Sequence, residues 1–454
     1  MTSRSQGPIR SGGRSTASTP TRTATTAATT APTTRSTDLS RALRTAALVA
    51  PVYVAAAILT PGGLFRERRF RDVGVYGDYA NALLDGRIPY RDFFVEYPPG
   101  GFLVFTPPAL LPDGWYLQAF KTLMAVVWLA TLVLVALVLL RLGASTRRLY
   151  GVLGALALSP LVIGPVALNT YDIWPAFLVL AAVAALLDGR DAAAFVLLAV
   201  AVAAKLYAAA LLPLFVVSLW RRKRPLRLPL TAFFLVAIVI VGPFALLGWD
   251  GLVESVRAQA GRALQIESTA AAVLLAADRL GVYDAQVVHG STAALSRDLA
   301  GSLPDAVAAV TSIVQVAAVI LVAFLFARGR ADGQRFVVAT AATLAGFLAF
   351  ARFVSPQYLL WLVPVVPLAG AVAGLVLAAA LLLGRLWFFH YRDVFALEGI
   401  VWLVVLRDLL VVVLYLVLLR TMIPSSSKTF RHEPLPRSRA SGTAVVEDDE
   451  RRSR

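Results

Sequence analysis

The sequence predicts an all-α integral membrane protein. Of its 454 residues, 58% are hydrophobic and only 15% are charged, and the mean hydropathy is +0.72. Soluble domains contain about 45–50% apolar and about 25% charged residues, so a water-soluble enzyme is excluded. The apolar residues form continuous stretches rather than an alternating pattern, which excludes a membrane β-barrel. At about 20 residues per span, there is room for about ten to twelve transmembrane helices.

Both ends of the chain are polar, and we expect a disordered tail at each. Residues 1–42 are rich in Ser, Thr, Ala and Arg and show no apolar periodicity, and residues 424–454 are similarly polar. Such segments cannot bury enough surface to fold. The first is also too long and too polar for a secretory signal. Its alternative role is a polybasic contact with anionic lipid.

The membrane domain is expected over residues 43–423. Two long polar segments interrupt it, residues 61–116 and residues 249–304, and a helix is expected within the second at 268–280. Its candidate spans cover residues 43–60, 117–140, 149–166, 173–187, 230–248, 305–327, 336–350, 357–368, 369–384 and 399–420.

Residues 193–219 form a further apolar run, which Lys205 interrupts. Charged residues typical of the cytoplasmic side flank it at 188–190 and 221–224, which favours a re-entrant hairpin of two short helices with Lys205 at its tip. A helix of twelve residues rises only about 18 Å, and such broken helices are tolerated where they line a cavity. Lys205 would then lie at the floor of a cavity open to the outside. The alternative is one long tilted helix with a snorkelling lysine.

The basic residues predict the orientation. Lys and Arg number 43 against 27 Asp and Glu, a net charge of +16, and the short connections 141–148, 220–229 and 328–335 are basic whereas 167–172 is not. Because basic short loops stay in the cytoplasm, we expect both tails there and both long polar segments outside. The excess of Arg over Lys favours a bacterial gene and hence a bacterial plasma membrane. The sequence contains no basic helix with interleaved aromatic residues, so we expect no nucleic-acid partner.

Polar and aromatic side chains are densest in residues 72–100, DVGVYGDYANALLDGRIPYRDFFVEYPPG. Helical spacing over 76–84, a natural cap at Gly86 and the Pro98-Pro99-Gly100 turn predict a short interfacial helix followed by a rigid loop. Carboxylates beside aromatic rings are typical of a sugar site, although each ring alone also suits interfacial anchoring. The candidate residues for binding the acceptor or sugar are Tyr76, Asp78, Asp92, Glu96 and Tyr97.

Four motifs along the chain share a family pattern. A carboxylate and a Tyr after the first span precede ALLDGRIPY, and AKLYAAALLPLF, RFVSPQYLLWLVP and LRDLL follow at 204–215, 352–364 and 406–410. Over residues 43–420 the chain thereby resembles the multi-span GT-C glycosyltransferases. In particular it resembles glycosyltransferase family 87, the mannosyltransferases that depend on polyprenyl-phosphate mannose.

The resemblance implies a GT-C-type bundle that performs inverting sugar transfer at the outer face of the membrane. The donor would be a polyprenyl-phosphate sugar, with mannose favoured, and the acceptor a cell-envelope glycolipid or glycan. The general base of the family lies just after the first span, which matches Asp72 here; Asp78, Asp92 and Glu96 are the other candidates. Glu96 has further interpretations, as an acceptor ligand, a helix cap or a partner of Arg91.

Arg352 and Lys205 are the candidate ligands of the donor phosphate. A guanidinium suits a phosphate, and an ionisable group at membrane depth is functional by default. The other interpretations are interfacial snorkelling for Arg352 and a bond to a carboxylate or carbonyl for Lys205. Gln357, with Ser355 beside it, is a candidate for binding the sugar or phosphate.

The remaining polar motifs have local explanations. We interpret Asp172 as the cap of the span that starts at residue 173, in preference to a site residue, and Arg407 and Asp408 as a buried ion pair. His289 is expected on the surface. There is no cysteine, and the three histidines and the absence of known cofactor motifs predict no metal centre and no bound cofactor, while a divalent-metal requirement stays open.

Two other function classes fit the composition. A secondary transporter or flippase for a lipid-linked sugar would share the spans and Lys205, but transporters show repeated halves, and the second half has no counterpart of residues 61–116. A non-catalytic scaffold in envelope assembly would keep the fold and tolerate the loss of Asp72.

Overall fold

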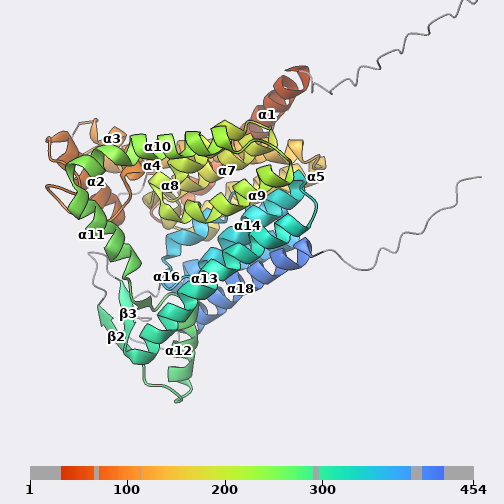
Figure 1. Ribbon diagram of the computed structural model, residues 1–454. Coiled ribbons are helices and arrows are strands. Elements are labelled where there is room, and N and C mark those ends of the chain that lie inside the picture. Colours follow the sequence, from red (N-terminus) through yellow and green to blue (C-terminus); the bar gives the residue numbers. More distant parts are fainter. Residues whose placement is uncertain (1–31, 66–70, 113, 290–295, 390–400, 424–454) are drawn as a thin grey trace, which may run out of the picture.

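The computed structural model describes residues 32–65, 71–112, 114–289, 296–389 and 401–423 (Figure 1). Among these residues, six helices are long and apolar enough to cross a membrane, and five shorter apolar helical segments accompany them. Since a bilayer offers no water to backbone groups, helices satisfy them within the segment. The predicted all-α membrane protein is confirmed.

The helices are α1 (Pro32–Leu59), α2 (Arg71–Leu84), α3 (Phe102–Ala109), α4 (Tyr116–Arg141), α5 (Thr146–Ile163), α6 (Val166–Asn169), α7 (Ile173–Leu187), α8 (Asp191–Ala204), α9 (Leu212–Arg221), α10 (Arg227–Leu247), α11 (Trp249–Ala260), α12 (Thr269–Arg279), α13 (Ser302–Arg328), α14 (Gly333–Ala349), α15 (Val366–Ala369), α16 (Ala371–Phe389) and α18 (Val401–Met422). Short 3-10 helices are η1 (Pro99–Gly101), η2 (Leu206–Leu211) and η3 (Pro356–Trp361), and the strands are β1 (Leu264–Gln265), β2 (Gln286–His289) and β3 (Arg297–Ala300).

The first helix begins earlier than predicted. We expected a tail up to residue 42, but α1 starts at Pro32. Helix α1 packs on α4 and α5, and its buried stripe of Ala42, Ala46 and Tyr53 begins at the last residue of the expected tail. A helix with one apolar stripe can pack on its neighbours even where its other faces are polar, so it can begin before the continuous apolar run. The rest of the first expected tail, residues 1–31, and all of the second lie outside the described residues.

The segment around Lys205 is broken into two short helices that form a hairpin. Helix α8 ends at Ala204, and Lys205 has an extended backbone with φ −158° and ψ 123°. The two ends of the segment meet, because Arg224 pairs with Asp191 (Nε to Oδ2, 2.8 Å) and donates to the Gly189 carbonyl at 3.0 Å. The structure therefore has the predicted hairpin of short helices and not the single tilted helix.

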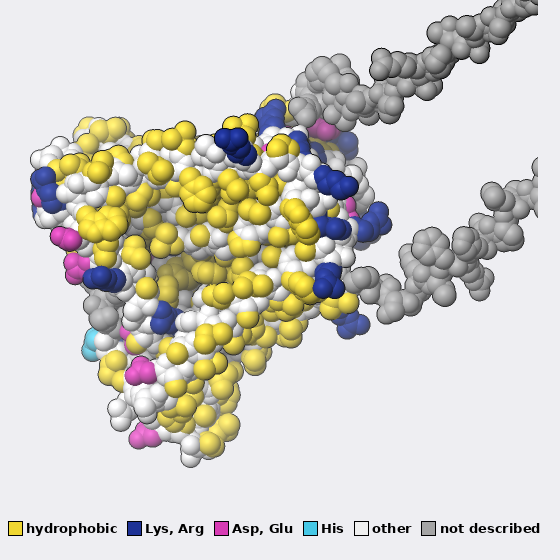
Figure 2. Space-filling view, viewed as in Figure 1, with side chains coloured by type: hydrophobic (Ala, Val, Ile, Leu, Met, Phe, Trp, Pro, Cys, Tyr) yellow, Lys and Arg dark blue, Asp and Glu magenta, His cyan; other side chains and the backbone are white. Residues whose placement is uncertain are grey.

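The predicted basic connections lie together. Figure 2 shows dark blue Lys and Arg side chains gathered at one end of the molecule. Several of them bind carbonyl groups at helix ends there: Arg148 donates to the Leu368 carbonyl at 2.6 Å, and Arg335 donates to the Met422 carbonyl at 2.7 Å. Arg221, from the connection after α9, donates to the Gly329 carbonyl after α13 at 3.0 Å.

The second polar segment contains a small sheet that the sequence did not predict. Strand β3 lies between β1 and β2, antiparallel to both, with Leu264 opposite Leu299. Strands of two to four residues are too short to give a clear alternating pattern. The predicted helix is present as α12, which Ser268 caps by accepting from the Ala271 N–H. In Figure 1 this segment projects at the end of the molecule opposite the start of α1.

In the first polar segment, α2 is longer than the predicted helix at 76–84. It begins at Arg71, so Asp72 stands in its first turn. Gly86 follows the helix with φ +82°, the left-handed conformation expected of a glycine cap.

Candidate active site

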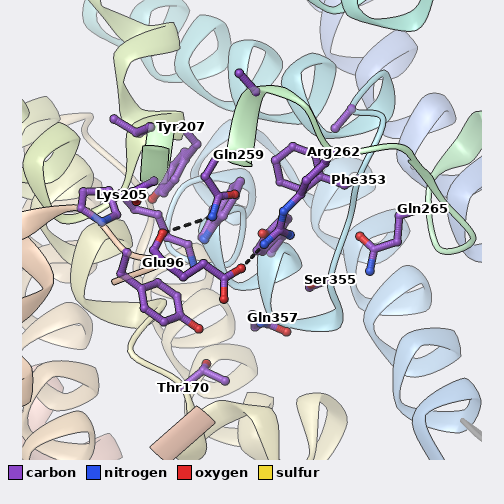
Figure 3. Close-up of a pocket in the computed structure, with 18 of the residues that line it drawn as sticks. Glu96, Thr170, Lys205, Tyr207, Gln259, Arg262, Gln265, Phe353, Ser355 and Gln357 are labelled. Atoms are coloured by element: carbon purple, nitrogen blue, oxygen red, sulfur yellow. Dashed lines mark hydrogen bonds and ion pairs between the residues drawn. The ribbon is translucent and has the colours of Figure 1, made fainter. Parts of the chain in front are cut away.

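A cavity of about 1160 Å³ lies between the membrane helices and the two polar segments (Figure 3). It combines chain segments that are far apart in the sequence: the start of α2, the loop before η1, Lys205, the α11–β1 connection and the segment that leads into η3. The predicted site residues that line it are Asp72, Glu96, Tyr97, Lys205, Arg352 and Gln357. As the described residues form it, Tyr76, Asp78 and Asp92 lie outside its lining.

Asp72 lies where a carboxylate is favoured, in the first turn of a 14-residue helix. The N-terminus of a helix carries partial positive charge, which stabilises an anion. The amide of Gln357 lies 3.5 Å from Asp72 Oδ2, although the two residues are 285 positions apart. The structure thus brings the predicted base together with the motif around Gln357.

Glu96 pairs with a residue that sequence analysis missed. Its carboxylate binds Arg262, from the α11–β1 connection, and its backbone carbonyl accepts from Gln259 at 3.1 Å. The Arg262 guanidinium also lies 4.8 Å from the centre of the Phe353 ring. The predicted alternative partner, Arg91, instead pairs with its neighbour Asp92. Glu96 therefore joins the two polar segments across the cavity, as the dashed lines in Figure 3 show.

Arg352 lies in the cavity wall and is bound by main-chain groups. Its guanidinium donates to the Ala260 carbonyl, and its own carbonyl accepts from the Gln265 N–H at 3.0 Å. A carbonyl is neutral, so this contact does not balance the positive charge of Arg352, and no carboxylate pairs with it within the described part of the chain.

Lys205 forms an ion pair with Asp172, 2.5 Å from Nζ to Oδ1. The same carboxylate oxygen accepts from the Trp361 indole at 2.7 Å. Three rings surround the ammonium group, with centres 4.7 Å (Tyr171), 5.0 Å (Tyr358) and 5.5 Å (Trp361) away. Of the two interpretations of Lys205, the bond to a carboxylate is therefore present.

The interpretation of Asp172 as a helix cap was wrong. In the described structure its side chain makes no capping hydrogen bond to α7, and its Oδ1 instead binds Lys205 and Trp361. A buried carboxylate needs a countercharge, and Lys205 supplies it. The sequence does not predict the contact between Asp172 and Lys205, because the two residues are 33 positions apart and no periodic pattern connects them.

An aromatic cluster backs the cavity, and Tyr76 belongs to its buried side. Its ring stacks on Phe105, with centres 4.4 Å apart, and meets Tyr97 edge-on at 5.3 Å. Only Tyr97 of the two tyrosines lines the cavity. Burial, with a smaller contribution from the charge of Asp72, holds the pKa of Tyr97 well above its usual range, so this hydroxyl stays protonated. Tyr76 therefore supports the wall instead of touching a ligand.

The two other carboxylates predicted to bind the acceptor or sugar, Asp78 and Asp92, face solvent. Asp78 is exposed and follows Asp72 by six residues, which rotates it about 240° around the helix. Asp92 is exposed and stabilises a turn: it binds Arg91 at 2.8 Å and accepts from the Ile88 N–H at 2.7 Å. The hydrogen bond from Arg91, followed by that from Ile88, lowers the pKa of Asp92 to about 2. The structure does not bring Asp78 or Asp92 to the cavity.

Comparison with known proteins identifies the family. The family model of glycosyltransferase family 87 matches residues 94–356, more than half of the chain. The chain belongs to glycosyltransferase family 87. No curated protein matches it.

This family 87 protein is therefore a multi-pass membrane glycosyltransferase, as predicted, which counts against the transporter and flippase alternatives. The matched residues include Glu96, Lys205, Arg262 and Arg352 of the cavity wall. Asp72 precedes the matched range, and its role as the base stays a prediction from the family resemblance.

The polar segment around β1 gives the family 87 protein two further wall residues that sequence analysis missed, Gln265 and Glu267. A signal was present: apolar Leu264 and Ile266 alternate with them, as in a short strand. Both apolar residues pack into a small core with α12 and α18, which directs the polar pair to the cavity.

Other predictions for the family 87 protein can be checked directly. Arg407 and Asp408 form the expected buried ion pair at 2.7 Å, and His289 is exposed on β2 as expected. Among the described residues, no group of three or more His, Asp or Glu side chains is arranged to hold a metal ion.

Proposed function

We propose that the protein transfers a sugar, with mannose favoured, from a polyprenyl-phosphate carrier to a cell-envelope glycolipid or glycan. One observation carries this proposal: the Asp72 carboxylate lies beside Gln357 in a cavity that also contains the cation of Arg352. A base and a cation in one cavity are what transfer from a phosphate leaving group requires.

In the proposed reaction, an acceptor hydroxyl oxygen attacks the anomeric carbon of the donor sugar. Asp72 takes the hydroxyl proton as the new glycosidic bond forms, which contributes about 10²–10⁴-fold to the rate. The bond between the anomeric carbon and the phosphate oxygen breaks on the opposite face, and polyprenyl phosphate leaves with the electron pair. The anomeric configuration is therefore inverted.

The charges in the wall favour Arg352 over Lys205 as the ligand of the leaving phosphate. The Lys205 ammonium is balanced by Asp172 at 2.5 Å, and Arg262 is balanced by Glu96. Arg352 donates to a neutral carbonyl and keeps its charge. A guanidinium that faces a developing phosphate dianion stabilises the transition state more than the ground state.

A lipid-linked donor is supported by the apolar side of the cavity. Ala237 and Val241 of α10 and Val316 of α13 line it, while Ile238 and Val239 of α10 are exposed on the outer surface. Figure 2 shows the apolar surface hollowed between the upper and lower parts of the molecule. An isoprenoid chain in the bilayer would reach the cavity without crossing a polar barrier.

The outer face of a bacterial plasma membrane is the proposed location of the reaction. The basic connections 141–148, 220–229 and 328–335 join α4 to α5, α9 to α10 and α13 to α14, and Figure 1 places them at the end opposite α2 and α11, whose residues line the cavity. Because basic short loops stay in the cytoplasm, this arrangement supports cytoplasmic tails and a cavity that faces outside.

The test is transfer of radiolabelled sugar from polyprenyl-phosphate mannose to membrane lipid extract by the purified protein in nanodiscs. We expect transfer by the wild type and a loss of about 10²–10⁴-fold in Asp72→Asn. Asp78→Asn, a matched change on the exposed face of the same helix, is the control and should remain within about twofold. Full activity of Asp72→Asn would refute its role, and no transfer from any polyprenyl-phosphate hexose would refute the donor class.

A further inference from the structure

Two buried polar side chains in the cavity wall carry oxygen atoms without a hydrogen-bond partner. Gln265 and Glu267 are 5% and 4% exposed and line the cavity. Gln265 Nε2 donates to Glu267 Oε2 at 2.8 Å, which holds the side chains together. The Oε1 atom of each has no partner among the described residues. Both oxygens are shielded by neighbouring atoms. Since buried polar atoms are nearly always hydrogen-bonded, each has bonding capacity that a ligand in the adjoining cavity would use.

The backbone that carries the pair is fixed on both sides. Arg407 of α18 donates to the Glu267 carbonyl at 2.5 Å, and Asp408 holds the Arg407 guanidinium at 2.7 Å. The Gln265 N–H donates to the Arg352 carbonyl, and the Gln265 carbonyl accepts from the Ser268 N–H at 2.9 Å. The buried ion pair of α18 thus holds the backbone of Gln265 and Glu267 in place. Because these residues are already ordered, ligand binding there costs little conformational entropy.

The chemistry of the pair selects a ligand with hydroxyl groups. Two neighbouring oxygens match two neighbouring hydroxyl donors of a sugar ring, whereas an isoprenoid chain has no donor and an ionised phosphate offers only acceptors. Burial raises the pKa of Glu267 to about 8; the charge of Arg407 lowers it and that of Asp408 raises it further. The Glu267 carboxyl is therefore neutral at pH 7. A neutral carboxyl both accepts and donates hydrogen bonds.

The position of the pair separates it from the groups around Lys205. Figure 3 shows Gln265 on the opposite side of the view from Lys205 and Glu96, with Ser355 and Gln357 between them. We propose that Gln265 and Glu267 form a subsite that binds neighbouring hydroxyl groups of the glycan acceptor. That the ligand is the acceptor follows from the proposed function, on which this inference rests.

The test measures binding instead of turnover. The probe is octyl α-D-mannopyranoside, with octyl tri(ethylene glycol) as an ether of equal tail that lacks neighbouring hydroxyls, titrated into the full-length protein in nanodiscs. We expect the wild type to bind the glycoside better than the ether. Gln265→Leu and Glu267→Leu should each weaken glycoside binding by about three- to tenfold, whereas Glu267→Gln should stay within about twofold.

Matched changes on the same polar segment serve as controls. Gln286 and Glu254 are exposed and outside the cavity lining, so Gln286→Leu and Glu254→Leu should bind the glycoside as the wild type does. Wild-type affinity in both Gln265→Leu and Glu267→Leu would overturn the proposal, as would equal binding of glycoside and ether by the wild type.

A second measurement needs no variant. Glycosides that lack one ring hydroxyl each should reveal two neighbouring positions whose removal weakens binding to the wild type by about three- to tenfold. Equal affinities across the set would overturn the proposal. Hydroxyl-dependent binding without any sugar transfer would refute the proposed function alone, and transfer with hydroxyl-independent binding would refute the subsite alone.

Discussion

Replacing Lys205 by Met removes the cation from a buried ion pair. The Asp172 side chain is 0% exposed and the Lys205 side chain 12% exposed, and their charged atoms are 2.5 Å apart. After the change, Asp172 would keep the indole of Trp361 as a donor but lose its countercharge. Removing one partner of a buried pair costs about 3–5 kcal/mol, and the loss of the cation above the aromatic rings belongs to the same cost.

The double variant gives the decisive comparison. Asp172→Asn should also cost about 3–5 kcal/mol, because it leaves the ammonium group unbalanced. Asn with Met leaves no buried charge, so the double variant should cost no more than either single one. The coupling energy is then about 3 kcal/mol.

The assay is reversible unfolding by sodium dodecyl sulfate in mixed micelles, followed by far-ultraviolet circular dichroism. Lys223, exposed at the basic end of the molecule, provides the matched control, since Lys223→Met should change the free energy of unfolding by less than about 0.5 kcal/mol. If the costs of Lys205→Met and Asp172→Asn simply add in the double variant, the pair does not stabilise the fold and our reasoning is refuted.

Three further outcomes are expected. Burial raises the pKa of Glu267 from about 4.5 to about 8, so its contribution to stability is full below pH 4.5 and is lost as the pH rises through 8. The free energy of unfolding should therefore fall by about 3 kcal/mol between pH 5.5 and 8.5, and Glu267→Gln should remove this slope; an equal slope in the variant would contradict it. Glu96→Gln breaks the pair with Arg262 and should raise amide hydrogen exchange in α11 about tenfold, equivalent to about 1.4 kcal/mol; unchanged exchange would show that the pair does not fasten the segment. Asp92→Asn should alter sugar transfer by less than about twofold, because Asp92 faces solvent in a turn; a large loss of activity would bring it into the reaction.

The spans could be predicted because burial in lipid requires long apolar runs, and Lys205 could be singled out because a charge within such a run is costly. The position of Asp72 came from its family pattern. The contact of Lys205 with Asp172 could not be predicted, because it forms between an irregular turn and a broken helix. For Tyr76 and Tyr97 the sequence showed two similar rings, and only packing decides which one reaches the cavity.

The structure of the second polar segment, residues 249–304, was harder to predict from the sequence. Polar residues between spans are expected in water, so the burial of Gln265 and Glu267 had little support in the sequence, and the pairing of Arg262 with Glu96 had none. The buried position of Gln265 and Glu267 involves α18, whose Arg407 binds the Glu267 carbonyl from 140 residues away. The alternation at Leu264–Gln265 was the one local sign, and two residues are too few to distinguish a strand from a loop.

The broken α8–α9 segment also constrains how the newly made chain enters the membrane. Helix α8 has 14 residues and reaches about 21 Å, so neither half can be released into lipid as an independent span. The Ala204 carbonyl, at the end of α8, accepts a hydrogen bond from the Tyr171 hydroxyl. Lys205 contacts both Asp172 and the ring of Trp361, and Trp361 is synthesised much later. The surroundings of Lys205 are therefore complete only once Trp361, far downstream in the chain, has been made. Until then its available partners are Asp172 and the ring of Tyr171, which precede it in the sequence.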